Sequence, residues 1–211
     1  MDKIVIIDYC DTLFKGQSLQ LYIEYLYSKI RPVSLFNYFF RFLLKFPISI
    51  DNYKKFAFKG IAGTSKADIE ILSRDFYEIA LKPKHNSVIE NIIFKHVDDK
   101  DKLIIASGGC IEYLKYLTND YLLDVVIATE LKYDKNNRLI GIKFPECLNQ
   151  NKVLYVQEYF NSLNLEWNNT ILYTDSPTDL PLLNKVNEGI VVGYSDVNPE
   201  WSKNKFTYLK I

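Results

Sequence analysis

The sequence lacks an excess of charge of either sign and has few cysteines. Its 211 residues contain 26 Lys and Arg against 26 Asp and Glu, whereas nucleic-acid-binding proteins usually carry a basic excess. The three cysteines, Cys10, Cys110 and Cys147, are too few and too scattered for a disulfide scaffold. The apolar start is short, contains Asp8 and has no signal-peptide pattern. We therefore expect a cytoplasmic protein that does not bind nucleic acid.

The sequence also lacks a convincing membrane-spanning run. Residues 33–50, VSLFNYFFRFLLKFPISI, have the length of a short spanning helix. The segment is interrupted by Asn37, Arg41, Lys45 and Pro47, which oppose insertion across a bilayer. We expect no membrane span and favour a helix pair buried in a cap, while an interfacial patch that touches lipid or a partner remains open.

Short apolar runs recur along the chain and have the pattern of strands buried on both faces. They lie at residues 3–7, 103–106, 123–128, 170–173 and 189–192. Helical patterns separate them, at residues 111–117, 152–163 and 180–186. This alternation predicts an α/β fold with a doubly wound, mostly parallel, Rossmann-like sheet. Residues 131–144 break the rhythm and predict a hairpin that turns at Asn136 and Asn137.

Residues 17–87 differ from the rest of the chain. They show helical periodicity, many Tyr and Phe residues and almost no strand signal. Thr64 or Ser65 is suited to cap a helix in this block. We predict an all-helical cap at residues 17–87, inserted into an α/β core made of residues 1–16 and 88–211.

Polar residues follow several of the predicted strands at the point where each strand ends. Asp8 ends the first strand, and Ser107, Gly108 and Gly109 end the second, while Asp175 ends a later one. Asp179 follows four residues after Asp175, at the start of a helix. Ligands of doubly wound sheets bind beyond the carboxyl ends of the strands, so these residues are expected to meet at one edge.

Carboxylates gathered at one edge repel each other unless a cation binds among them. Hard oxygen ligands with open positions suit Mg²⁺, which also binds phosphate. Ser107 can donate a hydrogen bond to a phosphate oxygen, and the two glycines allow the backbone to approach at a helix N-terminus. Lys152 is a candidate to complete the charge balance. A helix cap for a single Asp, and a solvated position for Lys152, are the structural alternatives.

In chain order, IIDYCDTL, LIIASGG, NKVLYVQEYF and ILYTDSPTDLPLL resemble the four motifs of the haloacid dehalogenase superfamily. The resemblance covers nearly the whole chain, and the position of the cap is similar to that of the phosphoserine-phosphatase-like branch. It implies that Asp8 is the nucleophile and that Ser107 and Lys152 bind phosphate. It also implies that Asp175 and Asp179 hold Mg²⁺.

The activity that this resemblance implies is a Mg²⁺-dependent phosphatase with an aspartyl-phosphate intermediate on Asp8. The expected substrate is a small phosphomonoester, such as an amino, sugar or polysaccharide-precursor phosphate. Dehalogenase chemistry through Asp8 is the alternative within the superfamily, and the paired acids Asp175 and Asp179 argue against it.

The sequence departs from the family pattern at Cys10. The pattern is Asp-x-Asp-x-Thr, and Cys10 stands where the second Asp belongs, although its backbone carbonyl can still ligate Mg²⁺. The missing carboxylate matters, because general acid–base help is worth about 10²–10⁴ in rate. Three explanations stay open. Asp11 substitutes as the acid/base, or the substrate, the cap or Cys10 supplies the proton, or the protein is a catalytically weakened module that binds phosphate and Mg²⁺.

Overall fold

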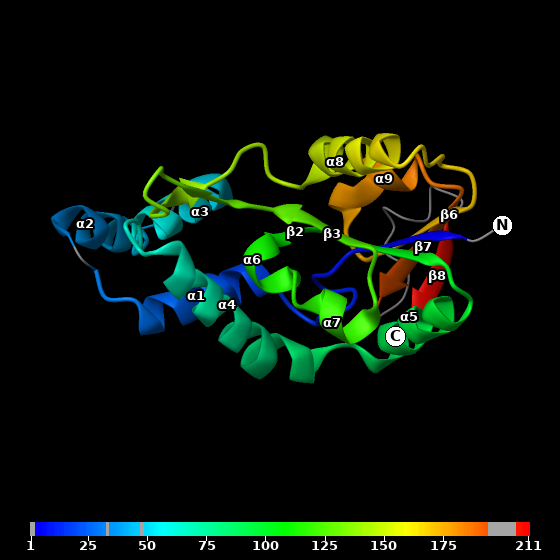
Figure 1. Ribbon diagram of the computed structural model, residues 1–211, viewed down its shortest axis with the longest axis horizontal. Helices are drawn as coiled ribbons and strands as arrows, with labels where there is room; N and C mark the ends of the chain where they lie inside the picture. The colour runs from blue at the N-terminus through cyan, green and yellow to red at the C-terminus, as the bar shows by residue number, and fades with distance from the viewer. Residues whose placement is uncertain (1–2, 33, 47–48, 194–205) are drawn as a thin grey trace.

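The structure is a computed structural model that describes residues 3–32, 34–46, 49–193 and 206–211. Six strands form its main sheet: β1 (Ile4–Ile7), β2 (Lys102–Cys110), β3 (Val125–Thr129), β6 (Thr170–Thr174), β7 (Glu188–Gly193) and β8 (Thr207–Lys210). All neighbouring pairs are parallel, in the order β3-β2-β1-β6-β7-β8 (Figure 1).

Strand β1 lies in the middle of the sheet, between β2 and β6. Val5 and Ile7 pack into the core layer on one face, and Ile4 and Ile6 pack into the layer on the other. All four side chains are buried. A strand buried on both faces needs apolar residues at every position, which is why its sequence is a continuous apolar run.

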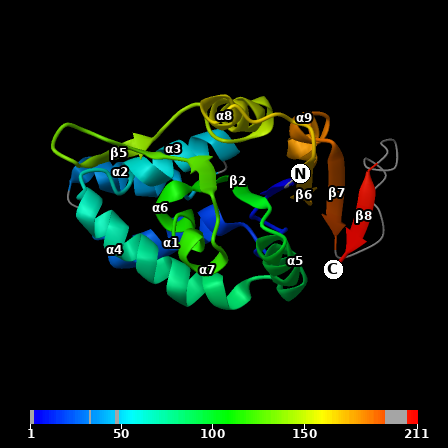
Figure 2. The same cartoon turned by 45° about the vertical axis from the view of Figure 1, so that its right-hand side comes forward.

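Helices cover both faces of the sheet (Figure 2). One face carries α8 (Asn149–Ser162) and α9 (Leu180–Leu183), and the other carries α5 (Ser87–Asp98), α6 (Ile111–Leu114) and α7 (Leu117–Tyr121). The predicted doubly wound α/β class is therefore confirmed. The single helix expected at residues 111–117 is instead two short helices, α6 and α7, separated by residues 115 and 116.

The order of the strands reverses between β1 and β6. From β1 the chain moves outward on one side through β2 and β3, and from β6 it moves outward on the other through β7 and β8. Such a reversal opens a crevice at the carboxyl ends of the two central strands, where ligands of this fold class bind. Strand β8, at the edge, was not predicted, since its short and half-exposed sequence has no continuous apolar run.

Between β1 and α5 the described chain forms helices: α1 (Ser18–Lys29), α2 (Leu35–Leu43), α3 (Ile50–Lys59), α4 (Lys66–Phe76), the π-helix η1 (Tyr77–Leu81) and the 3₁₀-helix η2 (Lys82–Lys84). Helix α1 buries Tyr22, Ile23 and Leu26, as its spacing predicts. Ser65 caps α4 by accepting the N–H of Asp68. The division into a core and a cap with the bounds given above stays a prediction.

A two-stranded antiparallel hairpin, β4 (Leu131–Tyr133) with β5 (Leu139–Ile142), lies against α3, as Figure 1 shows. The N–H of Gly63 donates to the carbonyl of Leu139 at 2.8 Å, and the N–H of Leu139 donates to the carbonyl of Thr64 at 2.9 Å. The hairpin is thus bonded to the helical block, although it falls within the predicted core range.

The aromatic segment at residues 33–50 contains α2 and the start of α3, and Val33, Pro47 and Ile48 lie outside the described residues. Within the part of the chain that the structure describes, no helix combines the length and the apolar character needed to cross a membrane. The expectation that this helix pair is buried is wrong for α2, since Leu35 is 88% exposed and Phe39 is 55% exposed.

Candidate active site

A cavity of about 650 Å³ lies at the carboxyl edge of the sheet, between the central strands and helices α1 and α3. Seven of the nine residues singled out from the sequence line it: Asp8, Cys10, Ser107, Gly108, Gly109, Lys152 and Asp175. Asp11 and Asp179 do not belong to its lining. The parallel sheet therefore brings together side chains that are up to 167 positions apart in the chain.

Lys152, in the first turn of α8, joins Asp8 at the cavity wall to Asp179 behind it. Its Nζ donates to Oδ1 of Asp8 at 3.0 Å and to Oδ2 of Asp179 at 2.7 Å. All three side chains are buried, and Lys152 is only 2% exposed. Burying an ammonium group is costly unless it is paired, so this geometry excludes the solvated position that the sequence left open for Lys152.

The burial of this cluster shifts its proton affinities. Burial raises the pKa of Asp8 to about 6, against the lowering effect of the Lys152 ammonium, and the charge of Asp179 adds to the rise. Burial by itself lowers the pKa of Lys152, but the two carboxylates outweigh it and raise that pKa above its ordinary value. Lys152 is therefore a permanent cation beside the carboxylate of Asp8.

Two threonines fix the acids that follow β6. The hydroxyl of Thr12 donates to Oδ1 of Asp175 at 3.1 Å and accepts the backbone N–H of Asp175 at 3.0 Å. The hydroxyl of Thr174 donates to Oδ2 of Asp179 at 2.8 Å. Asp175 thus faces the cavity, while Asp179 is held behind it against Lys152. Burial and the nearby charge of Asp8 raise the pKa of Asp175 to about 7.

The end of β2 forms one wall of the cavity. Its regular pairing with β3 shifts between Ser107 and Cys110, and the hydroxyl of Ser107 accepts the N–H of Gly109 at 3.1 Å. A Cβ atom on Gly108 would lie 2.4 Å from the Leu148 side chain, so this position requires glycine. Since α6 has only four residues, the expected helix N-terminus contributes little here, and the Ser107 hydroxyl and the Gly108 peptide group at the cavity wall are the groups placed to bind an anion.

Cys10 lines the cavity as a neutral thiol. Its Sγ lies 3.1 Å from Oγ of Ser18, which in turn lies 2.8 Å from the hydroxyl of Tyr113. Burial, reinforced by the charge of Asp8, raises the pKa of the Cys10 thiol to about 11. At neutral pH this side chain holds a proton and cannot act as a base.

Asp11 is engaged in a turn. Its backbone has a φ of 53°, in the left-handed region. One carboxylate oxygen accepts the N–H of Gly16 at 2.8 Å and the other accepts the amide of Gln17 at 2.8 Å. Because both oxygens stabilise this turn and the side chain does not line the cavity, the prediction that Asp11 replaces the second aspartate lacks geometric support.

The donor groups at this edge fit a small divalent cation. Two carboxylates, Asp8 and Asp175, line the cavity, and the pKa of each is raised, mainly by burial. The charge of Asp8 adds to the rise in the pKa of Asp175. A cation between them would remove the repulsion that opposes ionisation of both. Oxygen donors of this kind are the ligands that Mg²⁺ prefers. Asp179, in contrast, does not line the cavity, and its carboxylate contacts Lys152, which does.

The helical block supplies the opposite wall, with Leu19, Gln20, Ile23, Tyr53 and Lys54. The ammonium group of Lys54, in α3, forms a short ion pair with Glu146, which precedes α8. Both partners are largely buried, at 13% and 7% exposure. This ion pair links α3, which lines the cavity, to the segment that precedes α8.

Several of these residues were not singled out as site residues from the sequence. Thr12 belongs to the Asp-x-Asp-x-Thr pattern, so its spacing was a usable signal for a residue that fixes Asp175. Tyr53 and Lys54 have no such signal, because they reach the cavity only through the packing of α3 over the sheet. Ser18 has none either, since it meets Cys10 only when α1 packs against the sheet.

Comparison with protein families gives one match. Residues 5–184 match the model of the haloacid dehalogenase-like hydrolases, which covers most of the chain and all nine residues discussed above. No curated protein matches the sequence.

The structure is similar to several solved structures at low sequence identity. A protein of unknown function from Bordetella pertussis Tohama I has 14% identity and a TM-score of 0.80, over 100% of this chain and 99% of the other. A phosphoserine phosphohydrolase-like protein from Francisella tularensis subsp. tularensis has 19% identity and a TM-score of 0.65, over 97% and 94%. A phospho-aspartyl intermediate analogue of phosphoserine phosphatase has 14% identity and a TM-score of 0.54, over 98% and 93%. At these low sequence identities, the similarity shows a shared fold only.

Proposed function

The chain belongs to the haloacid dehalogenase-like hydrolases, and we propose that it hydrolyses a small phosphomonoester through an aspartyl-phosphate formed on Asp8. One observation carries this proposal. The buried carboxylate of Asp8, the Ser107–Gly109 turn and the ammonium of Lys152 line the same cavity. A solved structure of similar fold is described as a phospho-aspartyl intermediate analogue, which supports the same type of intermediate here.

In the first step, a carboxylate oxygen of Asp8 attacks phosphorus and the bond between phosphorus and the ester oxygen breaks. The leaving alkoxide takes up one proton and departs as an alcohol. The hydroxyl of Ser107 and the peptide N–H groups of the turn bind the phosphoryl oxygens. Lys152 holds the carboxylate of Asp8 in place and offsets the charge that gathers around it.

In the second step, water attacks the phosphorus of the aspartyl-phosphate and the bond to Asp8 breaks. The proton that the water loses passes to the Cys10 thiolate left by the first step, so inorganic phosphate is released and both the carboxylate and the thiol are restored. We propose that the thiol of Cys10 supplies the proton that the first leaving group needs. Cys10 lines the cavity and is protonated at neutral pH, whereas both oxygens of Asp11 are held in a turn.

We propose Mg²⁺ as the cofactor, held by the carboxylates of Asp8 and Asp175 and the backbone carbonyl of Cys10. When bound, Mg²⁺ neutralises negative charge between the phosphate and the attacking carboxylate. Thr12 orients Asp175 for this role, and Asp179 contributes by holding Lys152. A small phosphomonoester of the amino, sugar or polysaccharide-precursor type is the proposed substrate.

A second candidate function is a phosphate- and Mg²⁺-binding module with weak or no turnover. The observation that favours it is the neutral thiol of Cys10 in the cavity wall, which stands where the family pattern has a second aspartate. The two candidates differ in the fate of a bound ester, since only the first cleaves it.

Hydrolysis of p-nitrophenyl phosphate with and without Mg²⁺ tests the proposal, because its aryl leaving group needs little protonation. We expect Mg²⁺-dependent turnover by the wild type and a loss of at least about 10⁴-fold in Asp8→Asn. Circular dichroism of the variant serves as the folding control.

The Cys10→Asp variant separates the two candidates. If the wild type turns over and Cys10→Asp is faster, mainly on alkyl esters, then a phosphatase limited by its proton donor is supported. If the folded wild type shows no Mg²⁺-dependent turnover while Cys10→Asp gains it, then the binding module is the correct function.

A further inference from the structure

Helix α2 turns an apolar face away from the protein. Leu35, Tyr38, Phe39 and Phe42 follow the i, i+3, i+4, i+7 spacing of one helix face, and each is more than half exposed. Phe46, three residues beyond the helix, is 52% exposed and stacks edge-on against Phe42, with ring centroids 5.2 Å apart. We call these five residues the aromatic face.

The inward face of the same helix is the more polar one. Asn37 is 2% exposed, and its amide donates to the carbonyls of Lys59 and Ala62. Arg41 donates to the carbonyls of Gly60 and Ile30. An amphipathic helix of a globular protein normally buries its apolar face, so this helix is docked with the opposite polarity.

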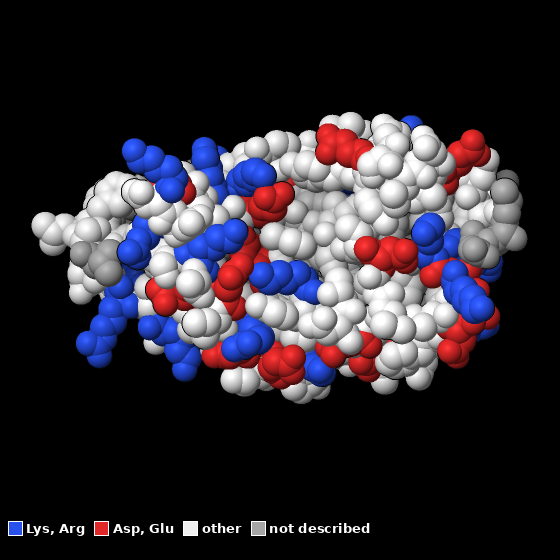
Figure 3. Space-filling view, in the orientation of Figure 1, with Lys and Arg blue, Asp and Glu red and all other residues white. Residues whose placement is uncertain are grey.

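The segment that carries the aromatic face is rich in basic residues. Residues 29–59 contain seven lysines and arginines and a single acid, Asp51, although the whole chain is balanced. Arg31, Lys45 and Lys55 are exposed, and within the described part of the chain none of the three forms an ion pair. Figure 3 shows basic side chains gathered at the end of the molecule that α2 forms.

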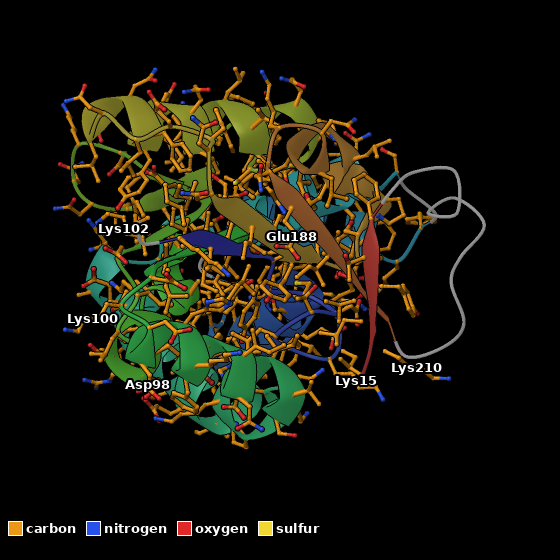
Figure 4. The ribbon with its side chains drawn as sticks, turned by 90° about the vertical axis from the view of Figure 1, so that its right-hand side faces the viewer. Lys15, Asp98, Lys100, Lys102, Glu188 and Lys210 are labelled. Carbon is orange, nitrogen blue, oxygen red and sulfur yellow. The ribbon has the colours of Figure 1, made fainter. Side chains whose placement is uncertain are left out.

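The opposite end of the molecule does not share this charge pattern. Figure 4 views that end and labels Lys15, Lys100, Lys102 and Lys210 together with Asp98 and Glu188, so basic and acidic side chains both occur there. Lys102 also pairs with Asp124. Acids of this end thus offset part of its lysines, whereas residues 29–59 contain seven lysines and arginines and a single acid.

We propose that the α2 end docks on an anionic lipid bilayer, with the aromatic face in the interfacial region and the basic residues among the headgroups. A helix with aromatic residues on one face and Lys or Arg beside it is the form that binds such surfaces. Tyr38 suits the boundary between water and acyl chains, since its ring is apolar and its hydroxyl is polar.

The charge distribution favours a bilayer over a second copy of this chain. Two copies meeting through their α2 ends would bring two basic patches together, which opposes association. An anionic bilayer offers complementary charge and an apolar layer at the same time. Since α3 packs on α2 and lines the cavity through Tyr53 and Lys54, docking brings that wall of the cavity near the lipid headgroups.

Co-sedimentation of the full chain with vesicles tests the proposal. We expect binding to vesicles of phosphatidylcholine with 30% phosphatidylglycerol and at least tenfold weaker binding to phosphatidylcholine alone. Binding should weaken as salt rises from about 0.05 M to 0.5 M, because exposed charges are then screened.

Two pairs of substitutions separate the apolar and the charged contributions. Phe39→Ser with Phe42→Ser should lower the partition coefficient at least about tenfold. Arg31→Gln with Lys45→Gln should lower it about 25-fold, since each basic residue near the surface contributes about fivefold. All four side chains are exposed, so these variants should fold.

Matched controls lie outside the α2 end. Ile79→Ser with Phe94→Ser removes exposed apolar side chains, and Lys84→Gln with Lys95→Gln removes exposed charges. We expect both pairs to bind vesicles as the wild type does. Hydrolysis of p-nitrophenyl phosphate by all these variants should also match the wild type, so failure of docking and failure of the phosphatase proposal are distinguishable.

Three outcomes would overturn the proposal. The first is no binding to anionic vesicles by the folded wild type. The second is an equal loss of binding in the control pairs and in the α2 pairs. The third is sedimentation as a dimer that Phe39→Ser with Phe42→Ser converts to a monomer, without vesicle binding, which would assign the aromatic face to self-association.

Discussion

The cavity buries charged side chains, whereas the α2 end exposes aromatic side chains to water. At the cavity, the charged groups of Asp8, Lys152 and Asp179 are buried, at 5%, 2% and 0% exposure. At the α2 end, Phe39 and Phe42 are 55% and 53% exposed. Each arrangement costs free energy in the isolated chain, because charges favour water and aromatic rings avoid it. Both regions are therefore candidates for ligand contact, the first with a phosphate and a cation and the second with a lipid surface.

The two regions also differ in how far other contacts compensate for this cost in free energy. The buried charges compensate each other through hydrogen bonds at 2.7–3.0 Å, which makes the cluster rigid. The exposed aromatic face has no compensation inside the molecule beyond ring contacts such as Phe42 with Phe46. Substitutions should consequently be destabilising at the cavity and nearly neutral for stability at the α2 end.

The largest effect on stability is expected for Lys152→Met. This change leaves Asp8 and Asp179 buried without their cation, and breaking a buried ion pair costs about 3–5 kcal/mol. Urea unfolding followed by circular dichroism measures the loss. Lys143→Met is the matched control, because Lys143 and Glu130 are more than half exposed and such pairs are worth less than about 1 kcal/mol. Equal losses in both variants would contradict the description of a buried cluster.

The second effect is a pH dependence of stability at His85, outside the cavity. The ring is buried between two tyrosine hydroxyls, of Tyr9 at 3.0 Å and of Tyr121 at 2.6 Å. Burial lowers the pKa of His85 to about 4, although Glu90 and Asp120 oppose the shift.

Because the unfolded chain binds this proton more readily than the folded one, the contribution of His85 is present in full above about pH 6.5 and is lost as pH falls toward 4. The loss amounts to about 3 kcal/mol. The difference between wild type and His85→Gln, followed by urea unfolding from pH 7 to pH 4, isolates this group from the acids that titrate in the same range. A difference that does not change with pH would contradict the assignment.

The third effect concerns Thr12, which fixes Asp175 at the cavity. Thr12→Val keeps the shape of the side chain but removes both hydrogen bonds to Asp175. We expect a loss of about 1–2 kcal/mol in stability and weaker Mg²⁺ binding, measured by isothermal titration calorimetry. Thr12→Ser retains the hydroxyl and should restore Mg²⁺ binding, whereas a purely structural role would leave the Mg²⁺ affinity of the valine variant unchanged.

The smallest effect is expected on the aromatic face. Phe39→Ser should change the free energy of unfolding by less than about 0.5 kcal/mol, because the ring is already in water. Phe40→Ser, one position along the same helix, should cost about 3 kcal/mol, because Phe40 is 8% exposed and packs against Phe56. Thermal unfolding of the two variants measures the contrast, and a large loss for Phe39→Ser would mean that the face is packed against the protein.

Much of the sheet and part of the site could be predicted from the sequence. A strand buried on both faces must be apolar throughout, so the run before Asp8 identified β1. Parallel strands end at a common edge, so Asp8, Ser107 and Asp175 could be expected together before any contact was known. Strand β8 escaped prediction because an edge strand that is half exposed has no such apolar run.

The orientation of polar groups around the site could not be predicted in the same way. Asp8, Cys10 and Asp11 are near neighbours in the chain, yet two line the cavity and the third closes a turn through Gly16 and Gln17. Asp179 was expected beside the metal and instead lies behind Lys152. The backbone path after the strand decides these positions, and local sequence does not specify that path.

The sequence alone determined the α/β class and most of the residues gathered at the carboxyl edge, because periodicity and strand ends are local properties. Only the tertiary structure decided which face of α2 meets the protein. The helix pattern marks Leu35, Tyr38, Phe39 and Phe42 as one apolar face, which local rules would bury. Hydrogen bonds from Asn37 and Arg41 to backbone carbonyls instead keep the polar face of the helix against the protein. Those carbonyls belong to other segments of the chain, and the spacing of residues in the sequence does not predict their contact with α2.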